Sequence, residues 1–202
     1  NIIDHTKTSP SGACDPRNKP SIDPNKNNYL IGYGSLMQLK SRLRTDKDAQ
    51  LAWPIDVLGF KRVFGLRGNS LYPTTFLTLI QSPGSLMNAV YFKVDSSSLS
   101  KLDDRESAYC RIKLSKKDFE FPNIKQSAPR EGVFWVYAHK GTSYQPATSQ
   151  YPLTQSYVDI FLGGCFEIQE DFNLNNFARQ CVQTTDAWPG PAAWVNDRVH
   201  AR

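Results

Sequence analysis

The sequence lacks the features that mark membrane proteins and nucleic-acid-binding proteins. No stretch of about eighteen consecutive apolar residues occurs, so we predict no membrane-spanning helix and no membrane partner. The net charge of +5 is modest and comes from scattered cations, among them Lys40, Arg42, Arg44, Lys61, Arg62, Lys116 and Lys117. A nucleic-acid groove requires a focused basic stripe with stacking aromatics, so we predict no nucleic-acid partner. A mild positive field suits a small anionic ligand instead.

Metal-ligand spacing is also missing. The four cysteines are Cys14, Cys110, Cys165 and Cys181, and the three histidines are His5, His139 and His200. No CxxC pair and no histidine cluster occurs, which disfavours a zinc site. One disulfide and four buried thiols are both compatible with these positions. The histidines lie far apart without an evident partner, so no Ser/His/Asp triad can be assembled.

The 202 residues are enough for one domain with a sizeable core. Residues 1–28 carry four prolines among polar residues and almost nothing apolar to bury. We therefore predict an irregular N-terminal arm over 1–28 and one folded domain over 29–202. The chain begins at Asn1 without methionine, which is compatible with an exported form whose signal has been removed.

Short runs rich in Val, Ile, Phe and Tyr alternate with turn clusters, which favours a sheet or a barrel. The expected strands are 29–33, 55–66, 75–82, 87–94, 109–115 and 131–139. One helix is expected to begin directly after residue 34. Three more are expected over 96–108, 154–168 and 172–182. Because these helices do not alternate regularly with the strands, we predict an α+β fold rather than a βαβ fold.

The stretch YLIGYGSLMQLKSRL, residues 29–43, joins a short apolar run to a helix-like segment through a glycine-rich turn. We expect Gly32 and Gly34 to permit close backbone approach and positive φ angles. Ser35 is the expected N-cap of the helix. The apolar face of that helix would consist of Leu36, Leu39 and Leu43.

A strand–turn–helix junction of this kind leaves backbone N–H groups unpaired, and these groups can bind an anion or an oxyanion. The alternative is that the glycines only make a tight turn. The turn is not a nucleotide phosphate loop, since neither that pattern nor GxGxxG occurs. Ser35 lacks a GxSxG elbow, which disfavours serine-hydrolase chemistry.

A carboxylate interrupts the apolar face of the expected helix 96–108. The residues on that face are Leu99, Leu102, Glu106 and Tyr109. An unpaired carboxyl that points inward loses hydration, so its pKa rises and it becomes a proton acceptor near neutral pH. The alternatives are that Glu106 reaches solvent or pairs with Arg111. Asp103 is a rival for the same role, but we expect it at the solvated edge of the helix.

GYGSL at 32–36 and LDDRESAYCRIKL at 102–114 follow one another in the chain. They resemble the YGS-L signature and the LD-x-x-E-x-x-Y-x-R segment of the gamma-glutamylcyclotransferase family, whose catalytic residue is that glutamate. TFLTLIQSPGSLMNAVYF at 75–92 resembles the connecting strands of the family, with Ala89 where glycine is usual. PLTQSYVDIFLGGC and WVNDR are similar to segments of longer bacterial members. The resemblance covers about residues 29–198 and excludes the arm.

The resemblance implies a small mixed β-barrel flanked by helices, with the turn and the glutamate at one mouth. It also implies a cofactor-independent reaction, without a metal, in which a small γ-glutamyl substrate cyclises to 5-oxoproline and releases its amine or amino acid. Glu106 would be catalytic. The residues implied to bind the substrate are Tyr33, Gly34, Ser35, Leu36, Tyr109 and Tyr137. For Tyr137 an ordinary core or rim position is the alternative, and Arg111 is expected to steady the local structure.

Two other functions compete with this hypothesis. A non-enzymatic barrel could use the same pocket to hold a small ligand, although an anion binder gains little from a buried carboxylate. A nucleic-acid-binding barrel would show steeply salt-dependent binding. The resemblance favours a cytoplasmic protein. The sequence does not choose between monomer and homodimer, nor among glutathione, γ-glutamyl amino acids, γ-glutamyl amines and lysine adducts as substrate.

Overall fold

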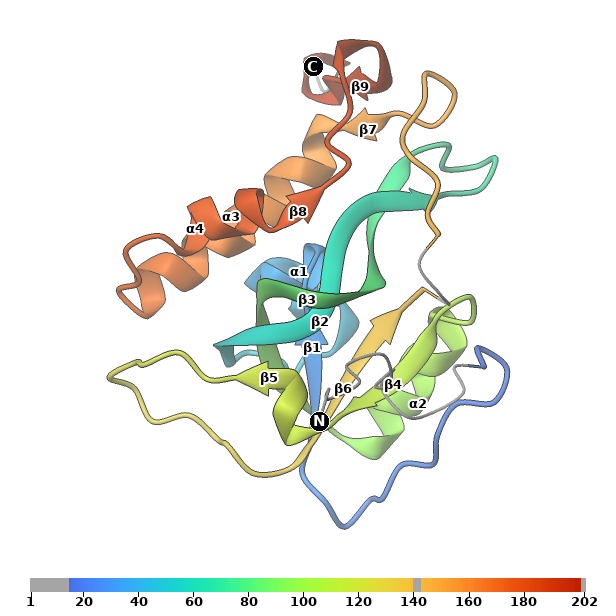
Figure 1. The fold of residues 1–202 in the computed structure, drawn as a ribbon. Coiled ribbons are helices and arrows are strands. Elements are labelled where there is room, and N and C mark those ends of the chain that lie inside the picture. Colours follow the sequence, from blue (N-terminus) through green and yellow to red (C-terminus); the bar gives the residue numbers. More distant parts are fainter. Residues whose placement is uncertain (1–14, 140–142, 201–202) are drawn as a thin grey trace, which may run out of the picture.

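The computed structural model describes residues 15–139 and 143–200 (Figure 1). The strands of its main sheet are β1 (Asn28–Gly32), β2 (Ala52–Arg67), β3 (Thr75–Val94), β4 (Cys110–Leu114), β5 (Phe119–Glu120), β6 (Val133–Ala138) and β8 (Thr185–Asp186). Their order is β4-β6-β1-β3-β2-β5, and β8 pairs with β2. Strands β7 (Leu153–Thr154) and β9 (Trp194–Val195) form a separate small sheet.

The helices flank this sheet. The α-helices are α1 (Leu39–Thr45), α2 (Ser96–Arg105), α3 (Gln155–Asp171) and α4 (Phe177–Gln183), and the 3₁₀-helices are η1 (Ser35–Met37), η2 (Lys116–Asp118), η3 (Pro191–Ala193) and η4 (Asp197–His200). The main sheet curls into a half-barrel, with α3 and α4 lying together along one side of it (Figure 1). The predicted α+β class, a small mixed barrel flanked by helices, is confirmed, and the barrel is half closed.

Strands β2 and β3 are long, and they bend where their pairing is interrupted. The register shifts between Leu58 and Phe60, where Gly59 has a φ of 81°, and such a bulge bends a strand. The prediction of two separate strands over 75–82 and 87–94 is wrong, because β3 continues through both. The Pro83–Gly84 pair that indicated a turn forms an irregularity inside β3 instead, since Gln81 and Leu86 are the nearest residues paired with β2.

Apolar side chains pack in two clusters on opposite faces of the strands. Adjacent residues of β1 show the alternation: Leu30 belongs to the cluster under α2, α3 and α4, whereas Tyr29 and Ile31 belong to the other. The second cluster is built from strands and contains stacked aromatic rings such as Tyr29 on Phe134. Both faces of β1 are therefore buried, which fixes the strand that leads into the glycine-rich turn.

Disulfide bonds and a docked N-terminal segment link parts of the chain that are distant in sequence. A disulfide joins Cys165 of α3 to Cys181 of α4, so the alternative of four thiols is wrong. Cys110 is disulfide-bonded as well, which is more than the one disulfide considered from the sequence. Residues 15–27 lack helix and strand, yet they are docked on the domain, because Lys19 Nζ donates to the carbonyl of Asp103 at 3.0 Å.

Within the described residues, no helix has the length and apolarity to cross a membrane.

Candidate active site

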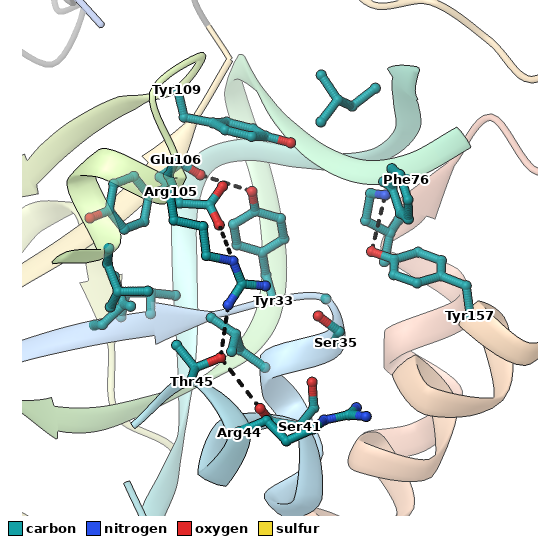
Figure 2. Close-up of a pocket in the computed structure, with 18 residues that line it drawn as sticks. Tyr33, Ser35, Ser41, Arg44, Thr45, Phe76, Arg105, Glu106, Tyr109 and Tyr157 are labelled. Atoms are coloured by element: carbon teal, nitrogen blue, oxygen red, sulfur yellow. Dashed lines mark hydrogen bonds and ion pairs between the residues drawn. The ribbon is translucent and has the colours of Figure 1, made fainter. Parts of the chain in front are cut away.

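A cavity of about 590 Å³ lies between the β1–η1 turn, α2 and α3. Its lining residues include all seven predicted from the sequence: Tyr33, Gly34, Ser35, Leu36, Glu106, Tyr109 and Tyr137. Figure 2 shows Glu106 and Arg105 on one side of the cavity, Tyr157 and Phe76 on the opposite side, and Ser35 between them. The tertiary structure thus brings the two sequence motifs to one place.

The glycine-rich turn offers unpaired backbone donors. Among the described residues, the amides of Gly34, Ser35 and Leu36 donate no hydrogen bond to a protein acceptor. Close approach disfavours a side chain at both glycines, because a Cβ on Gly34 would lie 3.2 Å from the hydroxyl of Tyr157 and one on Gly32 would lie 3.1 Å from Leu36 Cβ, and these neighbours would have to shift. The expected positive φ angles are wrong, since Gly34 has a φ of −122° and Gly32 is absent from the positive-φ residues.

The helix after the turn differs from the prediction. Ser35 is not an N-cap: it opens the short η1, and α1 begins only at Leu39, whose N–H donates to the Glu167 carboxylate of α3 at 2.8 Å. The expected leucine face is also wrong, because Leu39 is exposed while Met37 and Arg42 are buried. A 3₁₀ turn rotates the side chains that follow it, so the 3.6-residue period drawn from Ser35 assigned the wrong face.

Glu106 is the only carboxylate among the residues that line this cavity. It is the C-cap of α2 rather than part of it, so the expected extension of the helix to residue 108 is wrong, although Leu99 and Leu102 are buried as predicted. Its side chain is 28% exposed, and Arg105 Nε lies 3.7 Å from its Oε1. Burial raises the pKa of Glu106, and the charges of Arg105 and Lys19 oppose this rise only in part.

The raised pKa of Glu106 predicts a pH-dependent stability. Between the unfolded and folded pKa values the native state binds more protons than the unfolded chain, so stability falls as pH rises through this window. Glu106→Gln removes this titration. We therefore expect the unfolding free energy of the variant, relative to the parent protein, to increase from about pH 4 to about pH 7. Urea denaturation at both pH values measures the difference, and a constant or decreasing difference would contradict the assigned burial.

Tyrosines surround Glu106, and burial raises the pKa of Tyr33, Tyr109 and Tyr137, so that all of them stay protonated near neutral pH. The Tyr33 hydroxyl donates to the carbonyl of Tyr137 at 2.9 Å. The Tyr137 hydroxyl donates to Asp103 Oδ1 at 2.7 Å. Tyr137 is buried and also lines the cavity. Its hydroxyl oxygen can still accept a hydrogen bond from a further donor.

Asp103 and Arg111 have other positions than expected. Arg111 pairs with Asp103 at 2.8 Å, so its proposed pairing with Glu106 is wrong. Asp103 is not at a solvated edge: its side chain is 18% exposed and accepts from both Arg111 and Tyr137. Arg111 also stacks on Trp135, with 4.2 Å between the guanidinium carbon and the ring centroid. Arg111 Nη2 also donates to the carbonyl of Pro20 at 2.5 Å, so Arg111 connects β4, α2 and the arm. Glu106 is left with the longer ion pair to Arg105.

Tyr157 and Phe76, which complete the cavity, were not predicted as site residues from the sequence. The Tyr157 hydroxyl accepts the N–H of Leu77 at 3.2 Å, and the Tyr157 and Phe76 rings pack edge to face. Burial raises the pKa of Tyr157 to about 12. Tyr157 comes from α3, far from both motifs in the chain, and lies in the segment PLTQSYVDIFLGGC, for which the sequence indicated a helix but no role in the site.

His139 directly follows β6 and is not among the lining residues, and His5 lies outside the described residues. In residues 15–139 and 143–200, no group of three or more His, Cys, Asp or Glu side chains could hold a metal ion. The groups that the cavity offers for chemistry include one desolvated carboxyl, protonated tyrosines and free backbone amides, together with the side chains of Ser41, Arg44 and Arg105. Such a set can move a proton and stabilise an anion.

No protein-family model and no curated protein matches the sequence. Among solved structures, the human protein loc79017, described as uncharacterized, superposes with a TM-score of 0.53 at 16% identity, covering 86% of this chain and 96% of that one. A structure named gamma-glutamyl cyclotransferase has a TM-score of 0.51 at 16% identity with the same coverage. YkqA from Bacillus subtilis has a TM-score of 0.52 at 18% identity; the match covers 78% of this chain and 53% of YkqA, so the chain spans about half its length. These likenesses show the fold.

Proposed function

We propose that this protein, which has the gamma-glutamyl cyclotransferase-like fold, is itself a γ-glutamyl cyclotransferase that converts a γ-glutamyl compound into 5-oxoproline and a free amine or amino acid. One observation supports the proposal above all. The desolvated carboxyl of Glu106 and the free amides of the Gly34–Leu36 turn line the same cavity. A proton acceptor and an anion-binding turn in one cavity are what an intramolecular acyl transfer needs.

The reaction joins two groups of one molecule. The α-amine of the γ-glutamyl group attacks its own γ-carbonyl carbon, the new ring C–N bond forms, and the original amide C–N bond breaks. Of the three protons of the starting ammonium group, one stays on the lactam nitrogen and two end on the released amine. The protein therefore has to hold the substrate in attack geometry and move protons, which is where binding in a fixed orientation contributes most.

Glu106 is assigned the proton transfer. The substrate ammonium cannot attack until it loses a proton, and a carboxylate whose pKa burial has raised is a better acceptor than an ordinary one. The same carboxyl, once protonated, can pass the proton to the leaving amine. The tyrosines are not bases in this scheme, because burial raises the pKa of Tyr33 and Tyr109 and keeps their hydroxyl protons in place.

The turn amides are assigned to the negative charge. The γ-carbonyl oxygen becomes an oxyanion when the amine attacks, and the substrate also carries an α-carboxylate. The N–H groups of Gly34, Ser35 and Leu36 are free to donate to one of these groups, and donors of this kind act without reorganisation when charge develops. The Tyr157 hydroxyl lies beside Gly34 and uses its oxygen to accept from Leu77, so its proton is available as a further donor.

The proposal is tested by measuring 5-oxoproline release from glutathione, γ-glutamyl amino acids, γ-glutamyl amines and γ-glutamyl-lysine adducts. We expect release from at least one class, without added metal or cofactor, and equimolar formation of the free amine. Tight binding of one of these compounds without turnover would favour the non-enzymatic barrel. Absence of both binding and release over the whole panel would overturn the proposed function.

A further inference from the structure

Arg62 of β2 is a fully buried cation, with 0% of its surface exposed. Its guanidinium donates to oxygens of residues from separate elements: Tyr33 O, Asn88 O, Asn88 Oδ1, Cys181 O, Thr184 Oγ1 and Thr185 Oγ1. Among the described residues, none of its acceptors is a carboxylate, and it forms no ion pair. Its hydrogen bonds are satisfied, while its charge has no neutralising anion.

Such an arrangement is unfavourable for folding unless another benefit offsets it, because a buried charge normally needs a counter-ion. Burial lowers the pKa of Arg62 to about 9, which still leaves it protonated near neutral pH. The oxygens of Cys181 and Thr184 at the end of α4 compensate part of the charge. The remaining positive charge lies beside the candidate site.

Arg62 contacts the glycine-rich turn directly. Its Nη1 donates to the carbonyl of Tyr33 at 3.1 Å. A trans peptide is planar, so the N–H of Gly34 points opposite to that carbonyl and away from Arg62. Gly34 lines the cavity and its N–H has no protein acceptor among the described residues. Anchoring one end of this peptide therefore fixes the direction of the free donor at the other end.

The charge of Arg62 also reaches the cavity. It opposes the rise that burial causes in the pKa of Tyr33 and of Tyr157, and both of these tyrosines line the cavity. In addition, a donor on the Tyr33 carbonyl polarises the peptide and strengthens its N–H as a donor. Both effects favour a negative charge at the turn.

We propose that Arg62 is a positioning residue of the active site, which fixes the Tyr33–Gly34 peptide and supplies buried positive charge for an anion held by the turn. This inference rests on the proposed function. Arg62 does not touch the substrate in this scheme. It acts through the Gly34 N–H, which distinguishes it from a residue that only joins β2 to α4.

The test compares Arg62→Met and Arg62→Lys with Thr185→Val. The last variant removes the acceptor of Arg62 Nε, at 2.7 Å, and leaves Tyr33 untouched, so it is the matched structural control. Each variant is measured for thermal stability, for kcat and KM on the best γ-glutamyl substrate, and for the affinity of 5-oxoproline and L-glutamate by calorimetry. Arg62→Lys keeps the positive charge but loses the planar set of guanidinium N–H donors. It serves as the test variant if Arg62→Met does not fold.

For Arg62→Met we expect kcat per folded molecule to fall by about tenfold to a hundredfold, as for a weakened oxyanion donor, and the affinity for both anions to fall by about tenfold. Arg62→Lys should recover part of the anion affinity. Thr185→Val should lose stability while its kcat stays within about twofold of the parent protein.

Two outcomes separate this inference from the proposed function. If the parent protein releases 5-oxoproline and the Arg62 variants keep normal kcat and anion affinity per folded molecule, Arg62 is only structural and the inference is overturned. If the parent protein binds the anions without turnover, the proposed function fails, and an anion affinity unchanged by the Arg62 substitutions overturns the inference as well. A parent protein that neither reacts nor binds overturns both.

Discussion

Glu106→Gln is expected to lower the rate of 5-oxoproline release by about two to four orders of magnitude, the usual contribution of a positioned acid–base group. Glutamine has nearly the same shape but cannot take the proton from the substrate ammonium. Because the carboxyl accepts a proton only above its raised pKa, the parent protein should lose kcat/KM on the acid side of its pH profile. The remaining activity of the variant should lack this dependence.

Asp104→Asn is the matched control for this variant. Asp104 is two residues from Glu106, is exposed and does not line the cavity. Its replacement removes a carboxylate charge from the same end of α2 without changing the cavity. We expect its activity within about twofold of the parent protein, as for an ordinary surface substitution. Thermal unfolding verifies that Glu106→Gln is folded. A folded Glu106→Gln protein with full activity would refute the assigned mechanism.

Gly164→Ala is expected to destabilise the protein by about 1–3 kcal/mol and to impair the site at a distance. A Cβ on Gly164 would lie 2.5 Å from the backbone carbon of Met37, closer than real Cβ contacts, so α3 or η1 must move. Because η1 itself contains two of the three free amides, those of Ser35 and Leu36, the movement displaces the proposed anion donors. We expect a decrease in kcat/KM larger than the loss of folded protein explains.

Gly163→Ala provides the control, since both substitutions add one methyl group to the same helix. A Cβ on Gly163 would meet only the side-chain Nε2 of Gln38, at 3.3 Å, and that flexible end can move. Alanine also favours the helix over glycine by about 0.5–1 kcal/mol. Urea denaturation and steady-state kinetics should therefore show a neutral or stabilised, active protein. Equal effects of the two substitutions would mean that α3 does not hold the turn in place.

The elements that could be predicted are those with a local signal. The strands containing Tyr29, Arg111 and Trp135 follow from short β-branched and aromatic runs, and α3 from its apolar content. The predictions failed where a local signal had two readings. Pro83–Gly84 indicated a turn and is a bulge within β3, because pairing with β2 continues on both sides of it. Ser35 indicated an N-cap, but it opens the 3₁₀-helix η1, and the Glu167 carboxylate accepts from the first amide of α1.

The sequence by itself determined the α+β class and the two motifs, because residue type and spacing carry this information locally, and the family resemblance implied which residues would meet at the site. The tertiary structure alone decided that Tyr157 closes the cavity, that Arg111 pairs with Asp103 and not with Glu106, and that Arg62 holds the turn. Each of these contacts joins segments that are distant in the chain or on different elements. No local pattern selects the partner of a buried arginine, since its acceptors are backbone and hydroxyl oxygens that every sequence offers in excess, and only packing chooses among them.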